Sequence, residues 1–162
     1  LEPMRDSRLA VRVFNLAGRA GDFSLAWHAL GLVRAIGSMD RLREAALLSA
    51  VLAVESLVVN QGVKRLFRRA RPTVSGDDRF AVRTPSTSSF PSGHASSAVF
   101  AAILLGSFTG APLVCLWVGL AVLVAMSRVM VRIHHFTDIA AGAVTGALLG
   151  SVALAVSSAV LS

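Results

Sequence analysis

The sequence is poor in cysteine and in charged residues. Its single cysteine, Cys115, excludes an internal disulfide and, inside an apolar run, predicts an inert packing residue. Charged residues make up 15% of the 162 positions and hydrophobic residues 54%, with a mean hydropathy of +0.67. So little charge cannot form a shell that faces water on all sides, which indicates an integral membrane protein. No internal repeat, low-complexity tail or cleavable signal peptide is visible.

Among the charged residues, the acidic ones are the minority. The chain has 16 Lys and Arg against 9 Asp and Glu, and its net charge of +7 comes almost entirely from arginine. In a membrane protein this imbalance favours anionic lipid headgroups or a phosphorylated substrate as partners, before nucleic acid. The length is that of one domain.

The apolar runs predict an all-α, polytopic bundle of about five membrane helices. The first run, residues 23–37, is shorter than the roughly twenty residues of a full span and is interrupted by His28 and Arg34. It is therefore either a short or tilted span or a segment that lies partly in the interface. Residues 1–22 predict a basic amphipathic helix, either in the membrane interface or packed on the rest. Residues 45–161 form the expected core. The predicted spans are 23–37, 45–63, 94–109, 113–130 and 139–161.

Two features within the spans predict packing. The last span has no charge and carries Gly142, Gly146 and Gly150 at four-residue spacing, which favours close contact with a neighbouring helix of the bundle. Glu55 lies in the middle of its span, and a carboxylate there indicates a functional or partnered group. We expect a structural contact, with His28 or Arg34 as the candidate partner.

The stretch Ser127–Asp138 holds two arginines, two adjacent histidines and an aspartate between two apolar runs. Such groups at the edge of a hydrocarbon layer are costly and indicate a functional site. On a helix starting at about His134, Asp138 would lie one turn further on the same face. It could hold one imidazole nitrogen and leave the other free to attack. Taken alone, the stretch fits a solvated helix end equally well.

Two more polar clusters lie beside predicted spans. Lys64 and Arg71 are seven residues apart, which predicts a shared helix face, and Pro72 predicts the end of that helix. The run Pro91–His94 begins the next span, where free backbone N–H groups can bind an anion next to His94. As alternatives, the second cluster is a plain helix start and the first a headgroup anchor. Anchoring is the role expected of Arg65, Arg68 and Arg69.

The direction of the spans brings the three clusters to one side of the bilayer, where their cations, histidines and helix N-terminus suit a phosphate. In these clusters the chain resembles the type 2 phosphatidic acid phosphatase (PAP2) superfamily, which also includes class A acid phosphatases and vanadium haloperoxidases. The family motifs are K-x6-RP, PSGH and SR-x5-H-x3-D. They are matched by Lys64 with Arg71-Pro72, by Pro91-Ser92-Gly93-His94, and by Ser127-Arg128, His134 and Asp138. The likeness covers about 45–161, and the N-terminal part is shorter than in six-span members.

The resemblance implies a membrane-integral phosphatase that needs no metal or other cofactor. It implies that His134 becomes a phosphohistidine, that Asp138 orients it and that His94 protonates the leaving alkoxide. Fixed cations and helix-terminal amides agree with the needs of phosphoryl transfer. The residues implied to hold the phosphoryl oxygens are Lys64, Arg71, Ser92, Gly93 and Arg128.

Three other functions fit the sequence less well. A zinc site could use His94, His134, His135 and Asp138, but the cations around it would repel Zn²⁺, and we expect His135 to point away. Membrane burial and small size argue against a vanadate-dependent oxidase. A non-catalytic lipid-phosphate binding or transport protein would need only the cations.

The expected partner is a lipid phosphate within the membrane, with anionic lipids nearby and no nucleic acid. Phosphatidic acid, phosphatidylglycerophosphate, a polyprenyl diphosphate and a polyprenyl-linked sugar phosphate all stay open as substrates. The resemblance implies a bacterial cytoplasmic membrane with the site on the extracytoplasmic side. If 23–37 spans, the arginine count favours the opposite side, although arginines that serve an anionic substrate inflate that count.

Overall fold

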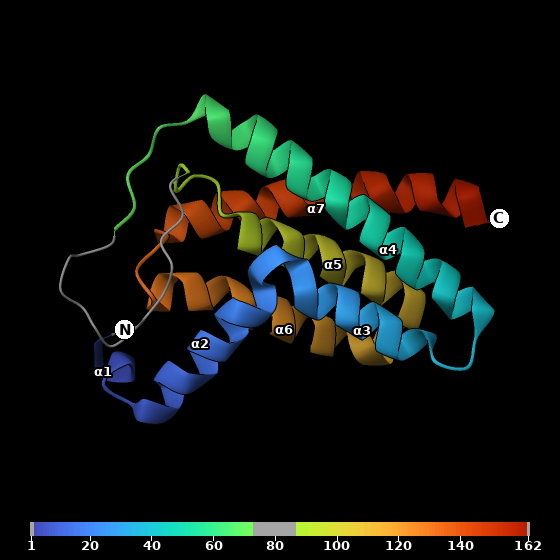
Figure 1. The fold of residues 1–162 in the computed structure, drawn as a ribbon, viewed down its shortest axis with the longest axis horizontal. Coiled ribbons are helices and arrows are strands. Elements are labelled where there is room, and N and C mark those ends of the chain that lie inside the picture. Colours follow the sequence, from blue (N-terminus) through green and yellow to red (C-terminus); the bar gives the residue numbers. More distant parts are fainter. Residues whose placement is uncertain (1, 73–86, 162) are drawn as a thin grey trace.

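The computed structural model describes residues 2–72 and 87–161, and within them every regular element is helical. The predicted all-α class is confirmed. Figure 1 shows the longer helices running side by side along the long axis of the molecule. In chain order the elements are α1 (Glu2–Arg5), α2 (Arg8–Gly21), η1 (Asp22–Ser24), α3 (Leu25–Ala35), α4 (Met39–Leu57), η2 (Val58–Gly62), η3 (Val63–Leu66), α5 (Gly93–Thr109), α6 (Ala111–Met130) and α7 (Phe136–Leu161).

Two of the described helices are long and apolar enough to cross a bilayer. They are α6 and the 136–157 part of α7, while α5 is apolar but shorter. Helix α3 has 11 residues, so at about 1.5 Å per residue it covers roughly half of a hydrocarbon core. It is therefore too short to be the predicted span 23–37 by itself. The count of five spans stays a prediction.

Helix α5 is the centre of the bundle and packs against α4, α6 and α7. The glycines of α7 are the reason that α7 lies so close to α5. A Cβ atom on Gly146 would overlap the carbonyl oxygen of Ser96, and one on Gly142 would overlap that of Ser92. The prediction that this stripe packs inside the bundle is confirmed.

The N-terminal segment folds onto the end of α6. The guanidinium of Arg5 donates from Nε to the carbonyl of Met130 at 3.1 Å and from Nη2 to that of Val129 at 3.0 Å, where α6 ends. Helix α2 packs along α6, and Leu9 and Leu16 on its outer side are exposed. These exposed apolar side chains on a basic helix agree with the predicted amphipathic character.

Two smaller predictions were wrong in part. Glu55 is buried and makes a structural contact, as expected, by accepting a hydrogen bond from the Ser96 hydroxyl, but neither His28 nor Arg34 is its partner. Those two side chains pair with Ser49 and Glu44 instead, in contacts between α3 and α4. Cys115 is exposed on α6, because it lies on the side turned away from the bundle.

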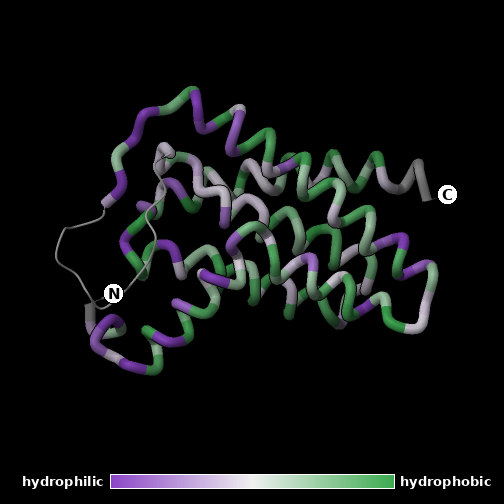
Figure 2. The backbone as a smooth tube through the Cα atoms, viewed as in Figure 1, coloured by the Kyte–Doolittle hydropathy of each residue, from purple (hydrophilic) through white to green (hydrophobic). Residues whose placement is uncertain are grey.

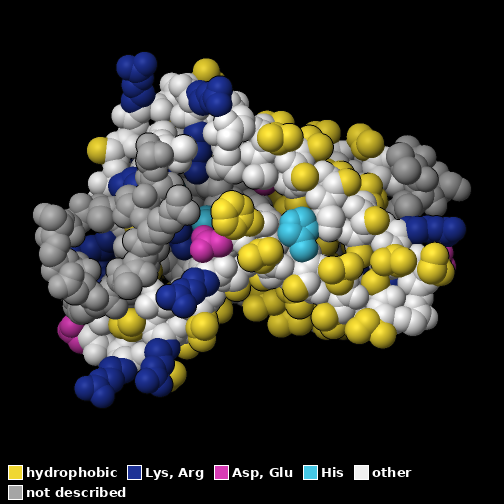
Figure 3. Space-filling view, viewed as in Figure 1, with side chains coloured by type: hydrophobic (Ala, Val, Ile, Leu, Met, Phe, Trp, Pro, Cys, Tyr) yellow, Lys and Arg dark blue, Asp and Glu magenta, His cyan; other side chains and the backbone are white. Residues whose placement is uncertain are grey.

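Polar residues gather at one end of the molecule. In Figure 2 the hydrophilic colour is concentrated near the N-terminus and the loops beside it, and the bundle beyond is mostly hydrophobic. The space-filling view in Figure 3 shows basic side chains clustered over the same end and a broad apolar surface next to them. All three predicted clusters lie at this end.

Candidate active site

His134 and Asp138 lie together at the start of α7. His134 precedes the helix, which begins at Phe136, so the predicted helix start at about His134 is two residues early. The pair still forms, with 3.5 Å between His134 Nδ1 and Asp138 Oδ2. This nitrogen is buried and has no hydrogen-bond partner among the described residues. A carboxylate so placed favours the tautomer that carries its proton on Nδ1.

The other nitrogen of His134 points at a cation. Arg71 Nη1 lies 3.3 Å from His134 Nε2, and since a guanidinium can only donate, Nε2 is the acceptor. The same Nη1 donates to the carbonyl of Ile133 at 3.0 Å, and Nη2 donates to that of Thr87 at 3.1 Å. Arg71 thus ties the loop before α5 to the His134 turn, and leaves Nε2 unprotonated as a nucleophile requires.

The carboxylate of Asp138 is fully buried and fixed by several donors. Its Oδ1 accepts from Arg69 Nη1 at 2.7 Å. Its Oδ2 accepts from the Ser89 hydroxyl at 2.5 Å and from the His135 backbone N–H at 2.8 Å. So many donors hold the carboxylate ionised and immobile, as an orienting group must be. Sequence reasoning missed Ser89, and it assigned Arg69 to headgroup anchoring.

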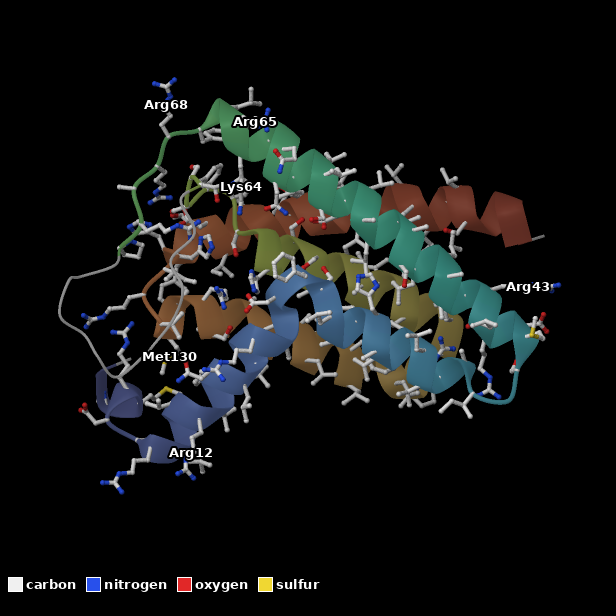
Figure 4. All side chains as sticks on the ribbon, in the orientation of Figure 1. Arg12, Arg43, Lys64, Arg65, Arg68 and Met130 are labelled. Atoms are coloured by element: carbon white, nitrogen blue, oxygen red, sulfur yellow. The ribbon has the colours of Figure 1, made fainter. Side chains whose placement is uncertain are left out.

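Lys64 reaches the site from the short helical turn η3. The expected continuous helix from Lys64 to Arg71 does not exist, because helical structure ends at Leu66 and Phe67 is extended, with φ −122° and ψ 145°. Lys64 and Arg71 nevertheless reach the same cavity. Figure 4 shows Lys64 on the inner side of the chain, while Arg65 and Arg68 project outward.

The helix start at Ser92–His94 forms as predicted. The Ser92 hydroxyl accepts from the Ala95 N–H at 3.4 Å, and the Ser92 N–H donates to the carbonyl of Asp138 at 2.9 Å. A Cβ atom on Gly93 would lie 3.4 Å from Lys64 Nζ, so glycine lets the lysine approach the helix N-terminus closely. The Ser92 side chain is fully buried and does not line the cavity. Its observed contact is therefore the helix cap, and not a position open to a phosphate.

Helix α2 and η1 form a further wall that the motifs did not reveal. A Cβ atom on Gly18 would meet Arg128 Nη1 at 2.8 Å, and one on Gly21 would meet His94 Cδ2 at 2.8 Å. Asp22 Oδ1 lies 2.9 Å from His94 Nε2. Two small residues and one acid therefore let this segment pack directly on two of the predicted site residues.

These side chains surround one cavity of about 890 Å³. The predicted residues on its wall come from η3, the following loop, α5, α6 and the turn before α7, while Asp138 and Ser92 lie buried behind it. His135 is absent from the wall, in line with the expectation that it points away, though its Nδ1 lies 3.3 Å from Asp138 Oδ2. The predicted wall residues are Lys64, Arg71, Gly93, His94, Arg128 and His134.

The family model of the PAP2 superfamily matches residues 44–160, most of the chain. The chain belongs to the PAP2 superfamily. Decaprenylphosphoryl-5-phosphoribose phosphatase of Mycobacterium tuberculosis, in strains CDC 1551 and H37Rv, is 36% identical over 132 residues, 82% of this chain and 72% of that protein. The enzyme of the same name from Mycolicibacterium smegmatis is 39% identical over 124 residues, 75% of this chain and 65% of that protein. The protein is a phosphoric monoester hydrolase.

Two solved structures share this PAP2 fold. The transmembrane PAP2 type phosphatidylglycerolphosphate phosphatase from Bacillus subtilis superposes with a TM-score of 0.71 at 24% identity, over 94% of this chain and 78% of that one. Aquifex aeolicus LpxE superposes with a TM-score of 0.61 at 22% identity, over 93% and 97% of the two chains. Both likenesses extend over the N-terminal helices, beyond the matched 44–160. The two likenesses show that the chain has this fold.

Burial and like charges shift the pKa values of the PAP2 site. Burial lowers the pKa of Lys64 to about 8, helped by the positive charges of Arg71 and Arg128. The pKa of His134 is lowered too, first by burial and then by Arg71 and Lys64. Neutral His134 beside several cations is the state in which an imidazole can attack phosphorus. Within 2–72 and 87–161, no three His, Cys, Asp or Glu side chains form a group that could hold a metal ion.

Proposed function

We propose that this PAP2 protein removes the terminal phosphate from a polyprenyl-linked sugar phosphate in the membrane, through a phosphohistidine on His134. The observation that carries the substrate class is the 36–39% identity to enzymes named for decaprenylphosphoryl-5-phosphoribose. Such a substrate has a phosphate to be hydrolysed, a sugar and a long apolar chain. The cavity offers a suitable wall for each of them.

The cationic part of the cavity suits the phosphate. Lys64, Arg71 and Arg128 can neutralise the phosphoryl oxygens, and the Gly93 amide lies at the N-terminus of α5. Arg128 is buried, and its Nε has no hydrogen-bond partner among the residues described. An unpaired buried donor beside two other cations supports anion binding here, because such a group is otherwise costly.

The rest of the wall suits the sugar and the lipid. Behind Lys64 it is lined by uncharged hydrogen-bonding side chains together with Glu55, which suits hydroxyl groups. On the side of α2 and η1 it carries Phe14 and the exposed Phe23, which suit an apolar chain. The uncharged polar lining residues behind Lys64 are Ser56, Asn60, Gln61 and Ser97.

The proposed reaction has two displacements. His134 Nε2 attacks phosphorus, the P–N bond forms, the P–O bond to the sugar breaks, and His94 gives a proton to the leaving oxygen. Water then attacks phosphorus and gives a proton to His94, the P–N bond breaks with its electron pair returning to His134 Nε2, and inorganic phosphate leaves. Asp138 holds the Nδ1 proton of His134 in both steps, as the third member of a nucleophile–orienter set does.

We also propose that the site faces the extracytoplasmic side, as the resemblance to membrane PAP2 enzymes implies. Three arginines at the site end give little support to the opposite orientation. Arg5 holds the end of α6, Arg69 holds Asp138, and Arg71 holds the His134 turn. Arginines with such partners serve the fold and the chemistry, so they should not be counted as topology signals.

Phosphate release by the purified protein in detergent tests the substrate class. We expect the highest kcat/KM with decaprenylphosphoryl-5-phosphoribose, ahead of phosphatidic acid, phosphatidylglycerophosphate and a polyprenyl diphosphate. Acid-labile ³²P on the protein, absent from His134→Ala, would support the intermediate. A clear preference for a glycerol-based lipid would contradict the sugar-phosphate proposal, and no release from any lipid phosphate would contradict the function.

A further inference from the structure

The contact between Asp22 and His94 lies outside the family motifs. Asp22 is in η1, before the matched range 44–160, and is 72 positions from His94 in sequence. Its Oδ1 is 2.9 Å from His94 Nε2, and both residues line the cavity. The hydrogen bond from His94 is the main reason that the pKa of Asp22 is lowered, with smaller contributions from Arg128 and Arg19. Asp22 is therefore an ionised acceptor for Nε2–H.

The backbone around Asp22 is shaped for this contact. Phe23 and Ser24 have positive φ angles of 52° and 59°, and they redirect the chain between α2 and α3 immediately after the acid. Gly21 leaves room for the imidazole edge, since a Cβ atom there would lie 2.8 Å from His94 Cδ2. Left-handed non-glycine residues beside a cavity are a feature of functional sites.

The other charged groups around His94 are mostly cationic. They come from every wall of the cavity, and all but Glu55 and Asp22 favour a neutral imidazole. Glu55 bonds to Ser96, so Asp22 is the carboxylate, among the described residues, within hydrogen-bond distance of His94. The groups concerned are Arg19 of α2, Glu55 of α4, Lys64 of η3, Arg71 in the loop, Arg128 of α6 and His134 before α7.

We propose that Asp22 is a positioning residue for His94: it accepts Nε2–H, fixes the ring, and favours the imidazolium that donates from Nδ1. The proposal rests on the acid role given to His94 above. As the P–O bond breaks, its electron pair stays on the leaving oxygen, which takes the Nδ1 proton. Asp22 remains a carboxylate throughout and gains no proton. The N-terminal segment would then complete an active site whose other residues lie in the motifs.

Leaving-group acidity distinguishes this role from a purely structural one. An alkoxide needs a proton as it leaves, whereas p-nitrophenolate is stable without one. We expect Asp22→Asn to lower kcat/KM by roughly 10–100-fold for a lipid or polyprenyl phosphate and by less than about threefold for p-nitrophenyl phosphate. The alkaline limb of the lipid-phosphate profile should move to lower pH, because an imidazolium that faces no carboxylate loses its proton more easily. Asp22→Glu should restore part of the lipid-phosphate activity.

Asp40→Asn is the matched control, since Asp40 is 86% exposed and pairs with Arg43 at the far end of the bundle. It should leave both activities unchanged. Equal losses of Asp22→Asn on both substrates, or no loss at all, would overturn the proposal. Either result, with a wild-type enzyme that releases lipid phosphate and a His94→Ala enzyme that does not, would leave the proposed function standing. Size-exclusion chromatography in detergent should show that each variant is folded, so that a loss of activity is not a loss of structure.

Discussion

The charged residues at the two ends of the bundle differ in burial and in the span of their contacts. At the far end, Arg43 and Asp40 are three residues apart, and their side chains are 70% and 86% exposed. At the site end, Asp138 is fully buried and its partner Arg69 is 69 positions away in sequence. An exposed local pair adds little to stability, whereas a buried charge is costly unless it is paired.

This difference indicates where the molecule carries its function. Burial of Lys64, Arg128, His134 and Asp138 close together disfavours folding, and such burial is typical of groups that are held in place for chemistry. The far end has no comparable cluster among the residues described. Charge count alone does not separate the ends, but burial and the distance of the partners do.

The largest effect should follow from removal of the nucleophile at the site end. We expect His134→Ala to lower kcat for lipid phosphate by more than ~10⁴-fold, because the attacking nitrogen is lost. The neighbouring His135→Ala should stay within about tenfold, since its side chain is off the cavity and only its ring contact with Asp138 is lost. Phosphate release measures both. Comparable activities of the two variants would remove His134 from the mechanism.

A smaller effect should separate two adjacent arginines at the site end. Arg69→Ala removes the donor to Asp138 Oδ1 and should lower kcat/KM roughly tenfold, because the carboxylate then orients His134 less firmly. Ser89 and the His135 N–H remain, which limits the loss. The Arg68 side chain is exposed and points outward in Figure 4, so Arg68→Ala should have the kcat/KM of the wild-type enzyme. If Arg68→Ala lowered kcat/KM as much as Arg69→Ala, both residues would act as headgroup anchors, the role that the sequence predicts for them.

The smallest effect on activity should come from the apolar body between the ends. Gly146→Ala places a methyl group on the Ser96 carbonyl, so we expect the Tm in detergent to fall by roughly 3–10 °C. Gly119→Ala is the control in α6, because a Cβ atom there meets nothing within 4 Å, and it should not lower the Tm. Activity of folded Gly146→Ala should change less than that of Arg69→Ala. An unchanged Tm would show that α5 and α7 are less tightly packed than the contact between Gly146 and Ser96 indicates.

The sequence by itself was sufficient for the family, the helical class and the motif residues. Lys64, His94, Arg128 and His134 were all predicted, and all line one cavity. They could be found because their spacing within each motif is local and because apolar runs mark helices directly. The glycine stripe of α7 was predictable for the same reason, since small residues four apart face one neighbour.

Only the tertiary structure decided which groups meet these residues. Asp22 contacts His94, which is 72 positions away in sequence, and Arg69 contacts Asp138, which is 69 positions away. Glu55 bonds to Ser96 and not to the partners expected for it. None of these contacts has a local pattern, because each depends on how two segments that are distant in sequence are placed and how closely they pack. The helix predicted from Lys64 to Arg71 was wrong for a related reason. Beyond Leu66 the chain is held extended by long-range bonds from Arg69 and Arg71, which outweigh its local preference for a helix.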